Sequence, residues 1–352
     1  MIEFKKVLKY ARILSPLKNF EEETLTFEYR EDPLTGRNTT VISGMLNYVG
    51  KFLTSDWELI GSIAERTRAA CPFCPENVKT RTPMFPADFI PEGRILIDDT
   101  VIIPNLLGHA EQSVLAILSR EHYLKLEEFK PKMFFNAFKG GLDYLKRLRQ
   151  RAPSVRFPVF AINYLPPAGS SILHPHMQIL ARDRPFYLVG LYLEKGREFY
   201  ESHGSSYWQS LAAVERESVR HLFMINGVEW FVPFAPLRGL NEVQAIVPGK
   251  SNLLELTEDE LFGLAEGLTR ILRFYGREGY ASFNAVLMSG PMDEHLEYFD
   301  VNLIVVSRPG VQPMGFTDAW TVSYILWDGE AVEEPEVFAG RVKAILEGDK
   351  LA

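Results

Sequence analysis

Residues 170–178 form the stretch that most constrains this chain. They place His174, His176 and Gln178 at every second position, with apolar runs on both sides. Because alternate residues of a β-strand face the same side, the spacing predicts a strand with three polar side chains in one row. Such a row can supply a metal ligand, a nucleophile and a hydrogen-bond donor. The spacing alone leaves open the alternative of two surface histidines without a chemical role.

The only two cysteines of the chain, Cys71 and Cys74, form a C-x-x-C motif surrounded by prolines. In a cytosolic protein this spacing favours metal or redox chemistry over a structural disulfide. The prolines favour a metal-binding loop, because a redox motif of this type would open a helix. Two thiolates need two further ligands, and the chain has seven histidines from which to draw them.

The composition narrows the classes of function. A formal net charge of -8 argues against a nucleic-acid-binding protein, although a few local donors could still bind a small phosphorylated ligand. We find no run of 18 or more apolar residues, so no membrane span is expected. The first residues lack the apolar core of a secretion signal. The hydrophobic content of 46% is that of an ordinary globular protein, and we expect a cytoplasmic one.

The order of predicted elements indicates an internal duplication. Residues 1–27 show weak helical periodicity, and the segment 30–37 predicts a tight turn between strands at 25–29 and 39–43. The later elements, as predicted from periodicity, are helices at 53–70 and 126–151, a mostly helical segment at 182–223, a helix capped by Thr257 and Glu260, and strands at 94–97, 100–103, 113–118, 229–233, 243–247, 282–287 and 301–306.

Both halves of the chain repeat one order of strands and helices. We therefore expect an α+β fold of two related units, each an antiparallel sheet with helices packed on it, fused in one compact body. The predicted units are residues 1–185, which hold the cysteine motif and the histidine stretch, and residues 186–352, a degenerate copy.

These motifs together resemble one enzyme family. Cys71-Pro72-Phe73-Cys74-Pro75, a histidine after a strand, and Gly169-x-Ser171-x-x-His174-Pro175-His176-x-Gln178 resemble galactose-1-phosphate uridylyltransferase, of the histidine-triad superfamily. The resemblance extends from about residue 28 to residue 250. It implies the two-unit histidine-triad fold, a nucleotide sugar and a sugar phosphate as substrates, and a homodimer.

The resemblance also implies a metal site. Cys71, Cys74, His122 and His174 correspond to the four ligands of a structural Zn²⁺. His109 is the alternative to His122. We prefer His122 because it follows a predicted strand, whereas His109 precedes it.

The remaining roles implied by the resemblance concern the reaction. His176 corresponds to the nucleophile, which forms a covalent nucleotidyl-histidine, and we expect its second ring nitrogen to donate to a backbone carbonyl. Gln178 corresponds to a donor to the phosphoryl group. The residues that correspond to substrate-binding groups are Asn163, Gly169, Ser170 and Ser171 around the phosphate, and Arg30 at the phosphate of the sugar substrate.

Other segments depart from the family pattern, so two further functions stay open. An Asn-Asp pair for the ribose is replaced before Pro104, and Asp300-Val301-Asn302 stands where a second H-x-H is common, so we predict no second metal of that kind. The leading hypothesis is nucleotidyl transfer between a nucleotide sugar and a hexose 1-phosphate, as in galactose metabolism. The alternatives are a nucleotide-sugar or dinucleotide phosphorylase that uses inorganic phosphate, and a zinc-stabilised nucleotide-sugar binding protein.

Overall fold

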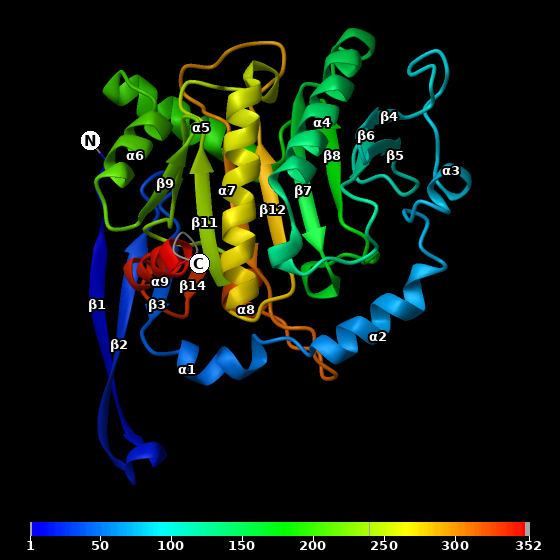
Figure 1. Ribbon diagram of the computed structural model, residues 1–352. Helices are drawn as coiled ribbons and strands as arrows, with labels where there is room; N and C mark the ends of the chain where they lie inside the picture. The colour runs from blue at the N-terminus through cyan, green and yellow to red at the C-terminus, as the bar shows by residue number, and fades with distance from the viewer. Residues whose placement is uncertain (1, 239, 349–352) are drawn as a thin grey trace.

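A single antiparallel sheet of ten strands forms the centre of the computed structural model, which describes residues 2–238 and 240–348 (Figure 1). Its strand order is β4-β5-β6-β8-β7-β12-β13-β11-β10-β9. The bounds of these strands are β4 Ile95–Ile97, β5 Thr100–Pro104, β6 Gln112–Ile117, β7 Phe157–Tyr164, β8 His176–Arg182, β9 His221–Ile225, β10 Val228–Phe231, β11 Leu240–Ile246, β12 Phe283–Met288 and β13 Asn302–Ser307.

The strand order confirms that the chain contains two related units. Counted inward from one edge, the strands are β4, β5, β6, β8 and β7, and counted inward from the other edge they are β9, β10, β11, β13 and β12. In both units the last two strands of the sequence are therefore exchanged in the same way. Each unit also inserts one long helix between its third and fourth strands in sequence. The units meet where β7 pairs with β12, from Val159 opposite Met288 to Tyr164 opposite Phe283. Their two sheets are thus one continuous sheet. The proposed boundary at residue 185 stays a prediction and falls between β8 and α5 (Tyr187–His203).

Two long helices, α4 (Pro131–Arg151) and α7 (Glu258–Arg277), cover one face of the sheet side by side (Figure 1). Thr257 and Glu260 cap α7 reciprocally, as the sequence predicted. Gly141 lets α4 approach β7 closely, because a Cβ at this position would lie 2.6 Å from the ring of Phe160. The side chains of β8 that point to this face, including Met177 and Ile179, are fully buried in the main core.

The other face of the sheet is covered only in part. In the second unit, α5 and α6 (Tyr207–Arg216) pack on it, and their apolar residues join Ile304 and Val306 in a second core. Loops of the first unit leave space on the same face above β5, β6 and β8. The predicted mostly helical segment 182–223 is confirmed over α5 and α6, but it begins with the last residue of β8, Arg182, and β9 begins at His221 near its end.

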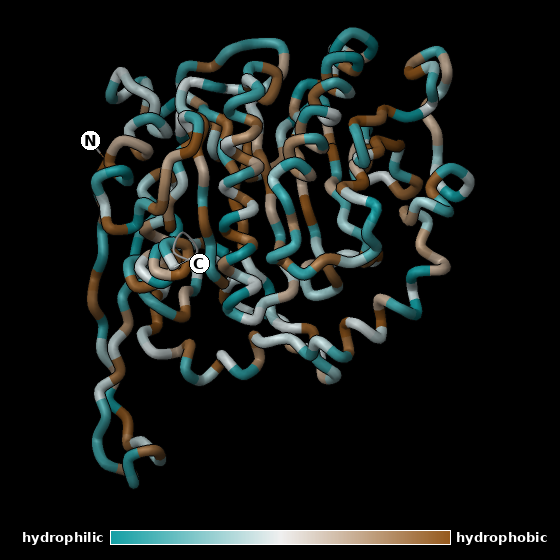
Figure 2. The backbone as a smooth tube through the Cα atoms, in the orientation of Figure 1, coloured by the Kyte–Doolittle hydropathy of each residue, from teal (hydrophilic) through white to brown (hydrophobic). Residues whose placement is uncertain are grey.

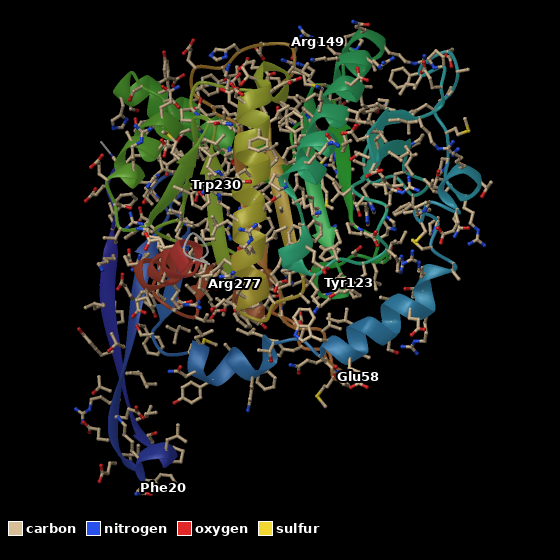
Figure 3. All side chains as sticks on the ribbon, in the orientation of Figure 1. Phe20, Glu58, Tyr123, Arg149, Trp230 and Arg277 are labelled. Carbon is tan, nitrogen blue, oxygen red and sulfur yellow. The ribbon has the colours of Figure 1, made fainter. Side chains whose placement is uncertain are left out.

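A small sheet of order β1-β2-β3-β14 lies beside the main sheet. Its strands are β1 Lys6–Ser15, β2 Glu21–Glu31, β3 Asn38–Ile42 and β14 Gly329–Ala331. The turn predicted between β2 and β3 is present. The weak helical periodicity of residues 1–27 was misleading, because residues 6–31 form a hairpin that extends beyond the body, with Phe20 near its far end (Figure 3). Figure 2 shows hydrophobic and hydrophilic residues alternating along this hairpin.

Four further α-helices of the described residues lie between strands, and one follows the last strand. The four are α1 Leu46–Val49, α2 Trp57–Arg68, α3 Val78–Arg81 and α8 Thr321–Tyr324, and the last is α9 Pro335–Gly348. The helix predicted at 53–70 corresponds to α2, and its amino end is capped by Asp56, whose carboxylate accepts a hydrogen bond from the Leu59 amide at 2.9 Å. Within the described residues, no helix is long and apolar enough to cross a membrane.

Arg30 joins the small sheet to the carboxyl-terminal helix. Its side chain is 1% exposed, and its guanidinium donates two hydrogen bonds to the Glu336 carboxylate, at 2.9 and 2.7 Å. It also pairs with Glu28 at 2.6 Å and donates to the Phe234 carbonyl. All three of its guanidinium nitrogens therefore donate within the protein, which ties β2 to α9.

We expect the Glu336→Gln variant to lose about 3 kcal/mol of unfolding free energy at pH 7, because the buried Arg30 charge would lose its bidentate partner. Burial raises the pKa of Glu336, but the hydrogen bonds and charge of Arg30 outweigh this effect and hold the pKa at about 2, from an ordinary value of 4.5. This stabilisation is therefore present above about pH 4.5 and is lost as the pH falls towards 2.

Urea unfolding of the parent and Glu336→Gln at pH 7 and near pH 3 measures this difference. Glu347→Gln, at an exposed position on the same helix, is the matched control and should change stability little. A Glu336→Gln deficit that stays constant between the two pH values would contradict the ion-pair assignment.

Candidate active site and metal cluster

The histidine stretch enters the sheet later than the sequence predicted. β8 begins at His176, so His176 and Gln178 lie on one face of a strand, whereas His174 precedes the strand. Pro175 separates the two histidines, and its carbonyl accepts the amide of Leu118 at 3.0 Å. The expected single row of three polar side chains is therefore corrected. His174 points into a buried cluster and His176 into a cleft.

Cys71, Cys74, His122 and His174 form the buried cluster. One ligand atom from each residue lies within 4.8 Å of the other three. The Nδ1 atom of His174 is 3.9 Å from the Cys71 sulfur and 3.7 Å from the Cys74 sulfur, and the Nδ1 atom of His122 is 3.5 Å from the Cys74 sulfur. Tetrahedral zinc with two sulfurs and two nitrogens requires ligand separations of about 3.4–3.8 Å. The three nitrogen–sulfur separations lie close to this range, so small shifts of the side chains would fit such a metal.

Hydrogen bonds at the far side of each ring fix which nitrogen can bind the metal. The Nε2 atom of His174 lies 2.9 Å from the carbonyl oxygen of Ser119, which can only accept a hydrogen. The Nε2 atom of His122 lies 2.9 Å from the Thr67 hydroxyl, which donates its own hydrogen to the Ile63 carbonyl. Both imidazoles therefore carry hydrogen on Nε2 and present the lone pair of Nδ1 to the cluster, the arrangement usual around metal-bound histidines.

The chemistry of the cluster also fits a cation. Burial lowers the pKa of His174 to about 4, so its ring is neutral at neutral pH. Burial, followed by the neighbouring Cys71, raises the pKa of Cys74 to about 12. Two buried thiols would form thiolates only beside a positive charge. The Asn77 side chain closes this loop by donating to the carbonyls of Cys71 and Ala69 at 2.8 and 3.1 Å.

His109 is not part of the cluster. It lies in the connection between β5 and β6 and lines the cleft that contains His176. Of the two histidines considered as the fourth ligand, the structure thus brings His122 to the cysteines.

A cleft of about 420 Å³ lies on the open face of the first unit. The exposed side chains of Leu106 and Leu107 form part of its lining, and among the described residues of that lining Arg81 is the one arginine or lysine. The residues most relevant to binding come from the cysteine loop, the β5–β6 connection and β8 with its preceding loop: Phe73, Asn105, His109, Gly169, Ser171, His176 and Gln178.

His176 has one ring nitrogen fixed and one available. Its Nδ1 atom lies 2.9 Å from the carbonyl oxygen of His174, which fixes the hydrogen on Nδ1 and the lone pair on Nε2. A backbone carbonyl partner for this nitrogen was expected from the sequence, and the structure identifies it as the carbonyl of His174. Burial lowers the pKa of His176, so its imidazole is neutral at neutral pH. The ring packs against Phe73, with centroids 5.3 Å apart. A neutral imidazole held in this way can act as a nucleophile.

Gln178 lies on the same face of β8 as His176 and also lines the cleft. Gly169 and Ser171 line it from the preceding loop, where Gly169 has a φ of +85° that favours glycine. Ser170 is buried and its hydroxyl donates to the Ile172 carbonyl at 2.7 Å, so it holds the loop rather than facing the cleft. Asn163 is half-buried on the neighbouring strand β7, and its side-chain oxygen accepts from Asn284.

Arg30 lies elsewhere. It is not among the residues that line the cleft, and its buried guanidinium is engaged with Glu28 and Glu336. Because no part of this charge is free to meet a phosphate, we leave Arg30 out of the proposed site.

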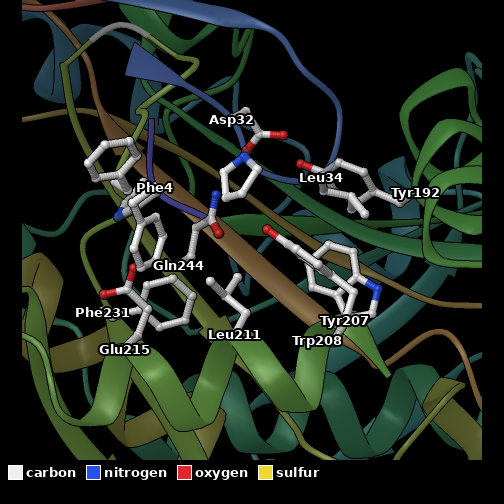
Figure 4. A pocket seen from close by; sticks show the side chains of 13 residues that line it. Phe4, Asp32, Leu34, Tyr192, Tyr207, Trp208, Leu211, Glu215, Phe231 and Gln244 are labelled. Carbon is white, nitrogen blue, oxygen red and sulfur yellow. The ribbon is translucent and has the colours of Figure 1, made fainter. Parts of the chain in front are cut away.

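A second, smaller pocket lies at the corresponding place of the second unit (Figure 4). Phe231 and Gln244 line it, and they are paired across β10 and β11 as Ile103 and Leu115 are across β5 and β6. Figure 4 shows Tyr207 and Trp208 on the helix that closes it. Its volume of about 20 Å³ has room for about one water molecule, and none of the described residues that line it is a histidine. The candidate site is therefore the cleft of the first unit.

Several residues that hold the cluster or the cleft residues in place were not predicted from the sequence. Thr67 and Ser119 orient the cluster histidines, Phe73 packs against both His174 and His176, and Asn284 reaches the site from the other unit. Phe73 could have been noticed, because it lies inside the cysteine motif. The other three occupy sequence contexts with no distinguishing pattern.

The comparisons with known proteins give one sequence relative and a shared fold. No family model matches the chain. An uncharacterized protein of Archaeoglobus fulgidus is 30% identical over 346 residues, which cover 98% of this chain and 99% of that protein. The fold is shared with an ADP-glucose phosphorylase of Arabidopsis thaliana solved with bound ADP-glucose (TM-score 0.68, 17% identity, 90% of this chain and 98% of that one).

Two further solved structures share the fold. One is a uridylyltransferase mutant (TM-score 0.66, 21% identity, 91% of this chain and 99% of that one), and the other is a galT-like protein of Arabidopsis thaliana (TM-score 0.65, 18% identity, 90% and 98%). The resemblance to the galactose-1-phosphate uridylyltransferase fold and the predicted fold class are thereby confirmed.

The composition of the cluster indicates that a bound metal requires His122 and not His109. We expect purified protein to contain about one equivalent of a divalent metal, His122→Ala to lose it together with much of the thermal stability, and His109→Ala to keep both. Elemental analysis and thermal unfolding of the three proteins measure this. A metal-free parent protein, or equal metal content in His122→Ala, would contradict the cluster as a metal site.

Proposed function

The chain belongs to one family with the uncharacterized protein of Archaeoglobus fulgidus, and we propose that it is a nucleotidyltransferase acting through a covalent nucleotidyl-histidine. Its donor substrate would be a nucleoside-diphosphate sugar and its acceptor a hexose 1-phosphate. The observation that carries this proposal is His176, whose Nδ1 hydrogen is held by the His174 carbonyl while its Nε2 lone pair belongs to a ring that lines the cleft.

The first step would form a nitrogen–phosphorus bond. The Nε2 lone pair of His176 attacks the α-phosphorus of the nucleotide sugar, and the bond from that phosphorus to the bridging oxygen breaks. The electron pair leaves with the sugar 1-phosphate. Positive charge that develops on the imidazole is shared through Nδ1–H with the His174 carbonyl at 2.9 Å. In the second step a phosphate oxygen of the acceptor attacks the same phosphorus, and the electron pair returns to Nε2.

Gln178 suits transfer between phosphates better than hydrolysis. An amide can donate a hydrogen bond to a phosphoryl oxygen but cannot accept a proton from water. A phosphate leaving group or acceptor needs no such base, because its oxygen is already anionic. The positions of Gln178, Gly169 and Ser171 in the cleft lining support a role for them in holding the phosphoryl oxygens, and Asn163 would contribute from β7.

The metal in the buried cluster would be Zn²⁺, with Cys71, Cys74, His122 and His174 as its ligands. Four protein ligands leave no open position, so this ion would be structural. Its contribution would be to hold His174, whose carbonyl orients His176 two residues later.

A phosphorylase is the second candidate. Among the described residues that line the cleft there is no Asp or Glu, the side chains that commonly accept hydrogen bonds from sugar hydroxyls. This composition favours an acceptor or donor without a hexose, such as inorganic phosphate or a dinucleotide, whereas the hexose of a nucleotide-sugar donor would be bound alike in both reactions. A binding protein without turnover is the third possibility, and the nucleophile geometry of His176 argues against it.

Intact mass spectrometry without acid tests the covalent step. After incubation with UDP-, ADP- or GDP-glucose and no acceptor, the parent protein should gain one nucleoside monophosphate, and the mass should identify the base. His176→Ala should gain nothing while keeping its metal, and Gln178→Ala should react about 10²–10³-fold more slowly. His295→Ala, at an exposed histidine of the second unit, is the control and should react as the parent does. Tight donor binding without any adduct would favour the binding protein.

The identity of the acceptor distinguishes the nucleotidyltransferase from the phosphorylase. Isolated nucleotidylated protein should release a nucleotide sugar when hexose 1-phosphates are added, with glucose 1-phosphate and galactose 1-phosphate tested separately. Release of a nucleoside diphosphate by inorganic phosphate, with no turnover by either sugar phosphate, would make the protein a phosphorylase and contradict the leading assignment.

A further inference from the structure

Residues on one face of the sheet lead from His176 into the second unit. The pairing of β8 with β7 ends at Ala161 opposite Gln178, so these two residues project from the same face. Because alternate residues of a strand share a face, His176 on β8 and Asn163 on β7 project from that face as well. Asn163 in turn is opposite Asn284 on β12. Residues opposite one another in neighbouring strands project from the same face, so Asn284 lies on the catalytic face, two strands from the nucleophile.

The side chain of Asn284 makes two hydrogen bonds, and both go to the first unit. Its Nδ2 atom donates to the side-chain oxygen of Asn163 at 2.7 Å and to the carbonyl of Ala168 at 2.9 Å. Ala168 directly precedes Gly169, which lines the cleft. A single amide group therefore holds both a strand residue and the loop beside the phosphoryl position.

The Ala168 bond also determines how Asn163 is oriented. A backbone carbonyl can only accept, so the end of the Asn284 amide that faces Ala168 must be its NH₂ group. The same NH₂ group then requires an acceptor from Asn163, which fixes Oδ1 of Asn163 towards Asn284. The NH₂ group of Asn163 is consequently directed away from Asn284 and is available as a donor. Without Asn284, nothing in this contact would prevent the Asn163 amide from rotating by half a turn.

The loop that Asn284 holds is conformationally strained. Leu165 has a φ of 66° and a ψ of 165°, a backbone conformation that is unfavourable for a residue with a side chain. Short-range hydrogen bonds to the Leu165 carbonyl come from Ala168 and Ser170, but all of them lie within the loop. The Asn284 bond to Ala168 attaches the loop to the rigid centre of the sheet.

We propose that Asn284 is a positioning residue for the phosphoryl transfer at His176, and this inference rests on the function proposed above. It sets the donor end of Asn163 and fixes the Gly169 loop, so that both meet the transferred phosphoryl group in one geometry. The second unit, which has no histidine in its own pocket, thus takes part in the reaction through a residue at the junction of the two units.

Two substitutions remove this function in different ways. Asn284→Ala removes the amide, and Asn284→Asp keeps its shape but replaces the donor by a carboxylate oxygen that cannot donate to Ala168. The matched control is Asn241→Ala. Asn241 is a buried asparagine of the second unit, and its amide donates to the Ser307 hydroxyl at 2.8 Å. Neither residue lines the cleft.

The kinetic test measures nucleotidylation of His176 by intact mass at saturating donor. Because a displacement of about 1 Å can cost about 10²-fold in rate, we expect both Asn284 variants to react about 10- to 100-fold more slowly, with donor affinity changed less than about 3-fold. Asn241→Ala should keep the parent rate even where its stability falls. A rate in the Asn284 variants equal to that of the control would overturn the inference.

Amide hydrogen exchange provides a readout that does not depend on activity. We expect faster exchange at residues 165–170 in both Asn284 variants and unchanged exchange there in Asn241→Ala. If the parent protein forms no adduct with any donor, the proposed function fails, and the exchange result alone decides whether Asn284 holds the loop. Unchanged exchange would overturn the inference even if the reaction is confirmed.

A double-mutant cycle tests the connection to Asn163. If Asn284 acts through Asn163, the double variant Asn163→Ala/Asn284→Ala should lose much less additional rate than the two single losses predict when multiplied. Fully multiplicative losses would show that the two residues act independently, which contradicts the positioning role through Asn163.

Discussion

The antiparallel pairing of β7 with β12 is the constraint on which the rest of the structure depends. It joins the edges of two related five-stranded sheets, so neither unit has an exposed edge at the junction. It also allows α4 and α7 to pack side by side over one shared core. The opposite face is then free to differ between the units. In the second unit α5 and α6 fill it, and in the first it remains open as the cleft.

His174 links the stability of the first unit to its chemistry. Its ring belongs to the buried cluster with Cys71 and Cys74, while its carbonyl accepts from the ring of His176. Any ion that fixes the His174 ring therefore fixes the backbone that orients His176, the proposed nucleophile. This arrangement separates the two tasks of the H-x-H pair, because one imidazole is removed from solvent and the other stays at the edge of the cleft. Pro175 between them makes the change of direction possible.

The chemistry available in the cleft matches a reaction between phosphate groups. The proposed site contains a neutral imidazole, an amide and a backbone loop, and neither the leaving group nor the acceptor has to gain or lose a proton. Catalysis would then depend mainly on the placement of hydrogen-bond donors around the phosphoryl group. Such placement is sensitive to small displacements, which is the physical reason that a residue such as Asn284, at the junction of the units, can matter for the rate.

The sequence by itself determined the features that depend on local spacing. The C-x-x-C motif, the H-x-H-x-Q stretch, the Thr257–Glu260 cap and the repeated order of elements each follow from residues close together in the chain, and the duplicated α+β fold followed from them. Only the tertiary structure decided the long-range partners. It brought His122 rather than His109 to the cysteines, it buried Arg30 against Glu336 instead of placing it at a phosphate, and it showed residues 6–31 as a hairpin. These outcomes depend on contacts between segments as far apart as β2 and α9, and no local pattern encodes which distant side chain will satisfy a buried charge or an open ligand position.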